Sequence, residues 1–186
     1  GGLHGVGISV VNALSESLTA TIHRGGEVTE QSFERGKPLG PPKVIGKTNR
    51  RGTIITFKPD FQIFETLTFD YETIAHHLRE LAYLNSGLKI TLRSEREGDP
   101  PEQVFQYSEG IVQLVRLLNE GKTVVHENPL YFSGEVDGFF VEVAMQYIQE
   151  TREHILSYAN NIRTDEGGTH LEGFKMAITN AIKQYG

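Results

Sequence analysis

Cysteine is absent from the 186 residues of the sequence. Its absence excludes disulfide scaffolds, thiolate zinc sites and cysteine nucleophiles, and it fits a reducing environment. No apolar run approaches the ~20 residues that a helix needs to cross a bilayer, and no signal-peptide pattern is present. The sequence therefore predicts no membrane-spanning segment and no disulfide framework.

Positive charge is scarce in the second half of the chain. Residues 107–186 contain 6 Lys and Arg against 11 Asp and Glu, whereas residues 1–106 contain 12 against 13. A broad contact with a nucleic acid backbone needs a basic footprint. Any contact with DNA must therefore be local or transient.

What is present is the composition of an ordinary globular protein, with 38% hydrophobic and 23% charged residues. At this length the chain holds one large or two small domains with a real core. It opens inside a loop, with no initiator methionine and no preceding strand, so we expect it to be an excerpt from a longer protein.

A glycine-rich segment, residues 1–7, runs directly into an apolar helix predicted over residues 8–14. The first N–H groups of a helix have no intrahelical partner, and glycine lets an anion approach them without a Cβ in the way. The segment lacks the Gly-Lys-Ser/Thr of a P-loop and the strand-borne G-x-G-x-x-G of a dinucleotide fold. It predicts a phosphate cradle, and a plain tight turn before a buried helix is the alternative.

The remainder of the first 106 residues predicts several strands and one long amphipathic helix. Leu18, Ala20 and Ile22 alternate with polar residues, which indicates a half-buried strand, and Gly25-Gly26 predicts a hairpin turn. The helix has Asp70 as its predicted N-cap. The other predicted segments are a return strand over 28–35, a loop over 36–42, strands over 52–57 and 88–92, the helix over 71–82, and a charged flexible segment over 95–102.

The second half predicts a further α+β arrangement. Thr169 and Glu172 form a T-x-x-E capping box, which predicts the start of a last helix after the Gly167-Gly168 pair. Asn160 and Asn161 have no role in this local interpretation. The other predicted elements are strands over 104–107, 130–136, 139–147 and 154–160, and a helix over 111–118.

Three of these segments together resemble one family, and they do so in order along the whole chain. Residues 1–14 resemble the nucleotide-lid motif GGLHGVG-x-SVVNALS of type II DNA topoisomerase ATPase subunits. Residues 78–87 resemble their LRELAFLNSG segment, and residues 160–174 resemble their NNI…GGTHLEGF stretch. Among these subunits, the asparagines and the LNSG sequence favour the gyrase B branch over the topoisomerase IV B branch.

The resemblance implies an α+β fold with two partial domains. Residues 1–106 would form the C-terminal half of a GHKL-type ATPase domain, a mixed sheet backed by helices. Residues 107–186 would begin an α+β transducer domain. The implied activity is ATP-driven passage of one DNA duplex through a break in another, with negative supercoiling as the result.

The resemblance also implies the binding residues. The backbone of the lid segment would hold the triphosphate of ATP, Thr53 would lie near the adenine, Ile55 would lie beneath its ring, and Arg24 would stand at the pocket rim. The lid residues are Gly2, Leu3, His4, Gly5, Val6, Gly7 and Ile8.

The chemistry of hydrolysis is not carried by residues of this sequence. In the family, the general-base Glu, the Mg²⁺-binding Asn and the adenine-binding Asp all precede the lid motif, so we assign no catalytic residue and no metal ligand here. Asn12 could bind Mg²⁺ by chemistry alone, but an Asn inside an apolar helix is typical of a polar group satisfied by packing. We therefore expect residues 1–186 alone to lack ATPase activity.

The implied partners are a DNA duplex in transit, a gyrase A subunit in a heterotetramer, and a second B subunit through nucleotide-dependent dimerisation. The implied location is cytoplasmic, with no membrane contact. A GHKL nucleotide-switched binding module, as in mismatch-repair proteins and heat-shock chaperones, is the alternative from a different functional class. Those relatives lack the GGTHLEGF and LNSG segments in this form.

Overall fold

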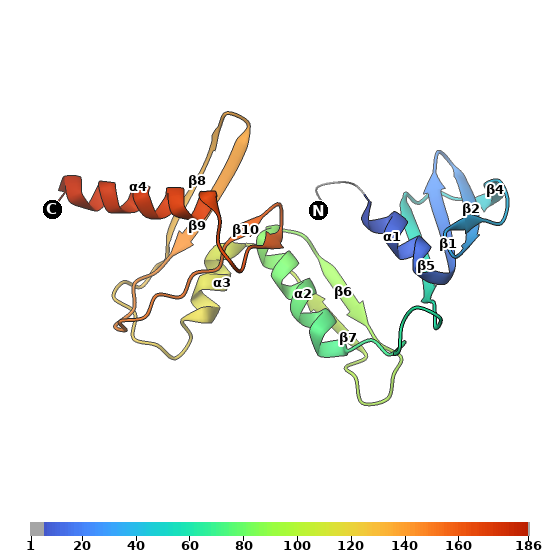
Figure 1. Ribbon diagram of the computed structural model, residues 1–186, viewed down its shortest axis with the longest axis horizontal. Coiled ribbons are helices and arrows are strands. Elements are labelled where there is room, and N and C mark those ends of the chain that lie inside the picture. The colour runs from blue at the N-terminus through green and yellow to red at the C-terminus, as the bar shows by residue number, and fades with distance from the viewer. Residues whose placement is uncertain (1–5, 186) are drawn as a thin grey trace. The chain divides into compact units, whose positions relative to one another are not determined.

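The computed structural model describes residues 6–185, and the chain divides after Phe69 into two compact units. Each unit is described by itself below. Over the described residues the structure has four helices and antiparallel sheets, so the α+β prediction is confirmed (Figure 1). The compact units are not the predicted domains, and the domain boundary after residue 106 stays a prediction.

The first unit, residues 6–69, is an antiparallel sheet with one helix packed against it. β1 lies in the middle and pairs with β2 on one side and β5 on the other, while β3 and β4 both pair with β2. The helix α1 contacts β1, β2 and β5. The elements are α1 (Gly7–Ala13), β1 (Ser15–Arg24), β2 (Glu27–Glu34), β3 (Lys37–Pro38), β4 (Lys43–Lys47) and β5 (Gly52–Pro59).

The alternation predicted for β1 is confirmed, and it places an apolar row across the sheet. Leu18 pairs with Phe33 of β2 and with Phe57 of β5, so the three side chains share one face. Leu18 is buried, whereas Phe57 stays 43% exposed and meets the ring of Phe69 edge to face. This apolar face is thus only partly covered within the unit.

The β1–β2 hairpin turns at Gly25-Gly26 as predicted, and both glycines have positive φ, +63° and +86°. The loop prediction for residues 36–42 is wrong at its start, because Lys37–Pro38 pairs with β2 as the short strand β3. The strand β4 was not predicted from the sequence. Its five residues all remain exposed, so they carry no buried periodic pattern.

The second unit, residues 70–185, is built around α2 (Tyr71–Leu84). The predicted N-cap is confirmed, since the Asp70 carboxylate accepts a hydrogen bond of 2.7 Å from the backbone N–H of Thr73. The buried face of α2 packs on the β6–β7 pair, where Phe105 is fully buried. The other elements are β6 (Ile90–Arg93), β7 (Glu102–Phe105), α3 (Ile111–Leu118), β8 (Leu130–Val136), β9 (Phe139–Met145), β10 (Tyr158–Ala159), β11 (Ile162–Arg163) and α4 (Thr169–Tyr185).

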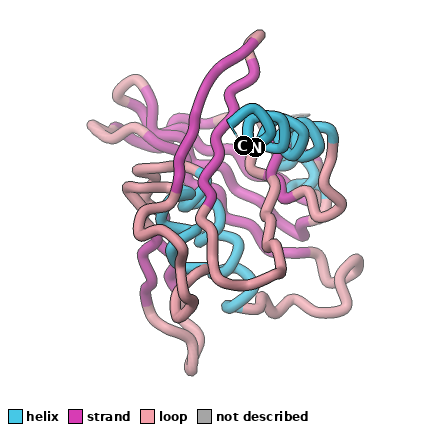
Figure 2. Tube along the Cα trace, turned by 90° about the vertical axis from the view of Figure 1, so that its left-hand side faces the viewer, coloured by secondary structure: helices cyan, strands magenta, loops and turns pink. Residues whose placement is uncertain are grey.

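The β8–β9 hairpin is largely exposed, and its tip lies away from the other elements of the unit (Figures 1 and 2). All seven residues of β8 are exposed. The predicted turn is confirmed, with Asp137 and Gly138 both at positive φ. Over residues 6–185, no helix is long and apolar enough to cross a membrane.

Two predictions for the last thirty residues need correction. Only Tyr158–Ala159 of the predicted strand over 154–160 pairs, with β11, and Asn160 and Asn161 form the turn between them at φ +50° and +67°. Asparagine tolerates this left-handed backbone, which explains why two adjacent asparagines occupy the turn. The capping box is wrong by one residue: the carbonyl of Gly168 accepts the first helical bond, from Glu172, so Gly168 rather than Thr169 is the N-cap of α4.

Candidate functional site

The start of α1 has the features of an anion site. The first intrahelical bond runs from Val10 N to Val6 O, at 2.9 Å, so the N–H groups of residues 7–9 precede the helical ladder. Among the described residues, the N-cap Val6 makes no side-chain hydrogen bond to this end, and no acidic residue lies in the first turn. The positive end of the helix is therefore not neutralised by its own side chains.

Gly7 is a position where the fold itself does not require glycine. Its φ lies outside the left-handed region, and a Cβ built there would meet no atom within 4 Å. Val6 and Ile8 beside it are half-exposed. The structure thus leaves open the space that the lid interpretation assigns to phosphate. Gly2, Leu3, His4 and Gly5 of the predicted site lie outside the described residues.

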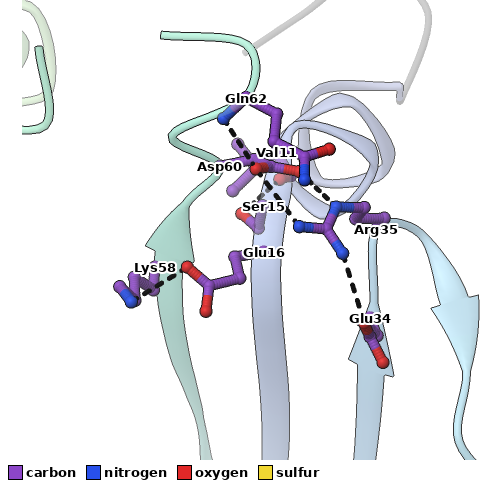
Figure 3. A network of polar contacts seen from close by, with 8 residues as sticks. All are labelled: Val11, Ser15, Glu16, Glu34, Arg35, Lys58, Asp60 and Gln62. Carbon is purple, nitrogen blue, oxygen red and sulfur yellow. Dashed lines mark hydrogen bonds and ion pairs between the residues drawn. The ribbon is translucent and has the colours of Figure 1, made fainter. Parts of the chain in front are cut away.

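A buried polar network holds the other end of α1 (Figure 3). The carboxylate of Asp60, only 1% exposed, accepts two hydrogen bonds from the guanidinium of Arg35, the shorter at 2.5 Å. The backbone N–H of Asp60 donates to Leu14 O, and the Ser15 hydroxyl donates to Val11 O. The last turn of α1 is thereby tied to the beginning of β1 and the end of β5.

The charges of this network stabilise each other. The Arg35 hydrogen bond, helped by the backbone N–H of Gln62, holds the pKa of Asp60 below its usual range. The Asp60 carboxylate in turn raises the pKa of Arg35. Gly36 completes the anchor, because at φ +79° its Cα lies so close to α1 that an added Cβ would stand 3.3 Å from the Cα of Ala13.

The two predicted adenine contacts lie on β5. Thr53 pairs with Ile22 of β1, and Ile55 pairs with Ala20, so all four side chains share the apolar face of the sheet. Ile55 is 37% exposed. The Thr53 hydroxyl can bind the polar edge of a ring, and the exposed Ile55 side chain can pack against its flat face.

A hollow of about 390 Å³ brings Thr53 together with Arg24. The predicted rim residue and the predicted adenine contact therefore meet, whereas Ile55 and the described lid residues do not line this hollow. The sequence interpretation missed Arg51, whose signal is the Arg-Arg pair directly before Gly52. The lining residues are Ile22, His23, Arg24, Arg51, Gly52 and Thr53.

Metal ligands are not grouped in the part of the chain that the structure describes. No group of three or more His, Asp or Glu side chains there could hold an ion.

The Asn12 Oδ1 atom is shielded from solvent and meets no hydrogen-bond donor among residues 6–185, so the packing interpretation does not account for this oxygen.

In the second unit, the structure brings together the two motifs that the sequence analysis treated separately. Glu80 of α2 accepts a hydrogen bond of 3.0 Å from the Tyr158 hydroxyl and lies 3.7 Å from the Arg163 guanidinium. The Asn161 amide donates to the side-chain oxygen of Asn85 at 3.3 Å. Burial, and then the Glu80 carboxylate, raises the pKa of Tyr158 to about 12.

Comparison with known proteins identifies the family. The family model described as DNA gyrase B matches residues 110–186. The B subunit of DNA gyrase from Bacillus mycoides is 49% identical over the entire chain, and its counterpart from Halalkalibacterium halodurans is 50% identical. The chain spans 46% of the first sequence and 29% of the second.

Solved structures agree with the sequence comparison. The 43K ATPase domain of Thermus thermophilus gyrase B, in complex with an aminocoumarin, matches 98% of this chain with a TM-score of 0.88 and 41% identity, and the match covers 50% of that domain. The B-subunit of DNA gyrase from Myxococcus xanthus matches 96% of the chain with a TM-score of 0.85 and 26% identity, over 52% of that structure. The chain belongs to the DNA gyrase B family.

Proposed function

We propose that this chain is part of the ATP-hydrolysing subunit of a DNA gyrase, where it couples ATP binding and hydrolysis to DNA strand passage and negative supercoiling. The observation that carries the proposal is the 49–50% identity to DNA gyrase B subunits over the entire chain, and the exposed start of α1, with open space at Gly7, agrees with it. An unneutralised helix start with glycine beside it suits a triphosphate. Family membership supports the same ligand, because the T. thermophilus match is named an ATPase domain.

Each part of the site has its own task in this proposal. The backbone N–H groups of the lid, Gly2 to Ile8, bind the phosphates of ATP, whose hydrolysis supplies the free energy for strand passage. The Thr53 hydroxyl orients the adenine, and Ile55 packs beneath it. The Arg35–Asp60 pair keeps α1 in position.

The residues of this chain bind and orient the nucleotide, and they do not activate water. No residue matches the family's general base, and the described residues contain no group of three or more His, Asp or Glu side chains that could hold an ion. General-base catalysis is worth roughly 10²–10⁴-fold. Residues 1–186 alone therefore should not hydrolyse ATP above background.

The domain division follows the family. Residues 1–106 belong to the GHKL-type ATPase domain, and residues 107–186 belong to the transducer domain. The family-model match over residues 110–186 supports this division. The partners we propose are DNA, a gyrase A subunit and a second B subunit, in the cytoplasm.

The test is a supercoiling assay with the full-length protein and a gyrase A subunit on relaxed plasmid. We expect negative supercoils with ATP and none when ATP is omitted. A non-hydrolysable ATP analogue should give less than one turnover per enzyme. ATP-dependent decatenation without supercoiling would instead indicate topoisomerase IV. The absence of both activities would overturn the proposal.

A further inference from the structure

A cluster of three arginines lies where the β1–β2 turn meets the β4–β5 loop in the first unit. Arg24, Arg50 and Arg51 are all exposed, and they line a hollow of about 580 Å³. The other lining residues are Gly25, Gly26, Thr48 and Asn49. We call these seven residues the arginine platform. Arg24 and Arg51 also line the hollow of about 390 Å³ next to Thr53, which we call the adenine hollow. Arg50 lines only the larger hollow.

The two loops of the platform are fixed to each other. The Thr48 N–H donates to Gly26 O at 2.9 Å, and the Thr48 hydroxyl accepts from the N–H of Arg50 at 3.0 Å. The same hydroxyl lies 3.2 Å from His23 Nδ1. At Gly25 and Gly26 an added Cβ would meet nothing within 4 Å, so the turn presents open backbone to the hollow. The platform is therefore organised before any ligand binds.

The charge of the platform is not balanced by its surroundings. Within residues 6–185, none of the three arginines forms an ion pair, in contrast to Arg35, which pairs with Asp60. Glu27 is the nearest acid in strand register, standing between Arg24 and Lys47 on the neighbouring strands. One carboxylate against three guanidinium groups and one ammonium leaves a net positive surface.

The chemistry of this surface fits phosphate. A guanidinium presents a planar fork of donors that matches phosphate oxygens, and the backbone N–H groups of the Gly-Gly turn can add further donors. No aromatic side chain lines the hollow, so bases would have nothing to stack on. Contacts of this kind bind a nucleic acid backbone without reading its sequence.

We propose that the arginine platform binds the phosphate backbone of duplex DNA. The proposal rests on the proposed function, and it supplies the local contact that the acidic second half of the chain does not offer. The exposed position of the platform on a turn and a loop is accessible to the side of a duplex.

Salt dependence provides the first test, with the full-length protein and a labelled duplex of mixed sequence. Each lost phosphate contact lowers the slope of log K against log salt by about 0.9, so Arg50→Gln should lower it by about 1 and Arg50→Gln/Arg51→Gln by about 2. The control is Lys37→Gln/Lys43→Gln, which removes the same charge from exposed positions outside the hollow and should leave the slope near the wild-type value. Equal slopes in the Arg double variant and the wild type would overturn the proposal, as would equal losses in both double variants.

Cross-linking provides the second test, because this chain contains no cysteine of its own. Asn49→Cys should exchange with a duplex that carries a mixed disulfide tethered to one phosphate, which releases the small thiol and leaves the protein cross-linked well above the wild-type background, whereas Lys37→Cys should not. Equal yields from both positions would contradict the platform. Competition by polyglutamate but not by DNA would identify an acidic protein segment as the ligand instead, and would also overturn the proposal.

A nucleotide titration separates this inference from the proposed function. Arg50→Gln should bind a non-hydrolysable ATP analogue as the wild type does, because Arg50 does not line the adenine hollow. If Arg50→Gln bound both the nucleotide and DNA as the wild type does, the proposal for the arginine platform would be wrong and the proposed function would stand. Wild-type protein that binds DNA through the platform but binds no nucleotide would defeat the proposed ATPase role alone.

Discussion

The two compact units hold their functional segments in different ways. In residues 70–185 the core is apolar: Tyr71, Ala75, Ala82, Tyr83 and Phe105 are all buried around α2 and the β6–β7 pair. In residues 6–69, by contrast, the described buried residues are Leu18 and two polar groups, Ser15 and Asp60. The first unit thus fixes α1 with hydrogen bonds and an ion pair.

This difference predicts how each unit responds to change. An apolar core loses free energy in proportion to the buried volume removed, and it is insensitive to acid. A polar anchor fails when one partner is neutralised or its protonation changes. The pH response should therefore reveal which unit is being destabilised.

The largest effect is expected from the apolar core. Phe105→Ala removes a fully buried ring and should lower the free energy of unfolding by about 3–5 kcal/mol. Phe132→Ala is the matched control, because Phe132 of β8 is 56% exposed. Urea unfolding followed by circular dichroism checks both variants. Similar losses would show that stability does not depend on the α2 core more than on the exposed hairpin.

A loss confined to the first unit is expected from Asp60→Asn. The folded-state pKa of Asp60 is lowered, so its stabilisation is fully present above the ordinary carboxyl pKa of about 4 and is lost as pH falls through the lowered value. Asp60→Asn should lower the thermal midpoint at neutral pH and flatten the acid limb of the stability curve. Asp137→Asn, in an exposed turn that asparagine also tolerates, should do neither. An unchanged acid limb in Asp60→Asn would show that the Arg35–Asp60 pair does not stabilise the first unit.

A smaller effect, at the alkaline side, is expected in the second unit. The pKa of Tyr158 is raised to about 12, so its stabilisation is present below the ordinary tyrosine value of about 10 and is lost between there and about 12. Tyr158→Phe should cost about 0.5–1.5 kcal/mol at neutral pH through the lost hydrogen bond to Glu80, and should reduce the alkaline loss. Part of that loss should remain, since burial also raises the pKa of Tyr83 to about 12.

The control for this variant is Tyr185→Phe, because Tyr185 is 94% exposed. Stability curves between neutral pH and the alkaline limit compare the two. If both variants followed the wild-type curve, the contact between α2 and the β10–β11 hairpin would contribute nothing to folding.

Local patterns predicted the elements whose signals are complete within a few residues. The Gly25-Gly26 hairpin, the Asp70 cap of α2 and the Asp137-Gly138 turn each follow from turn or capping chemistry. The Arg35–Asp60 pair could not be predicted, because its partners stand 25 residues apart and meet only after β2 and β5 flank β1. The β10–β11 turn was missed because two adjacent asparagines in left-handed conformation carry no hydrophobic pattern that would mark the turn.

The candidate site was predicted from family resemblance more than from spacing. Thr53 and Arg24 are 29 positions apart, and the strand register that brings both to one hollow depends on the β1–β5 pairing. Arg51 was adjacent to a predicted residue, yet its role depends on the β4–β5 loop folding back on the Gly-Gly turn. Register and loop contacts of this kind are properties of the folded sheet.

The most direct test of the central claim is the affinity of the full-length protein for a non-hydrolysable ATP analogue, measured by isothermal titration in Gly7→Ala and Gly46→Ala. Neither glycine has positive φ, and an added Cβ meets nothing within 4 Å at either position, so the two variants should be equally stable. Gly7→Ala should weaken binding by about tenfold, or about 1.4 kcal/mol, because its Cβ would occupy the space of the phosphates. Gly46→Ala should bind as the wild type does. Equal affinity in both variants would contradict the assignment of the α1 start as the phosphate site.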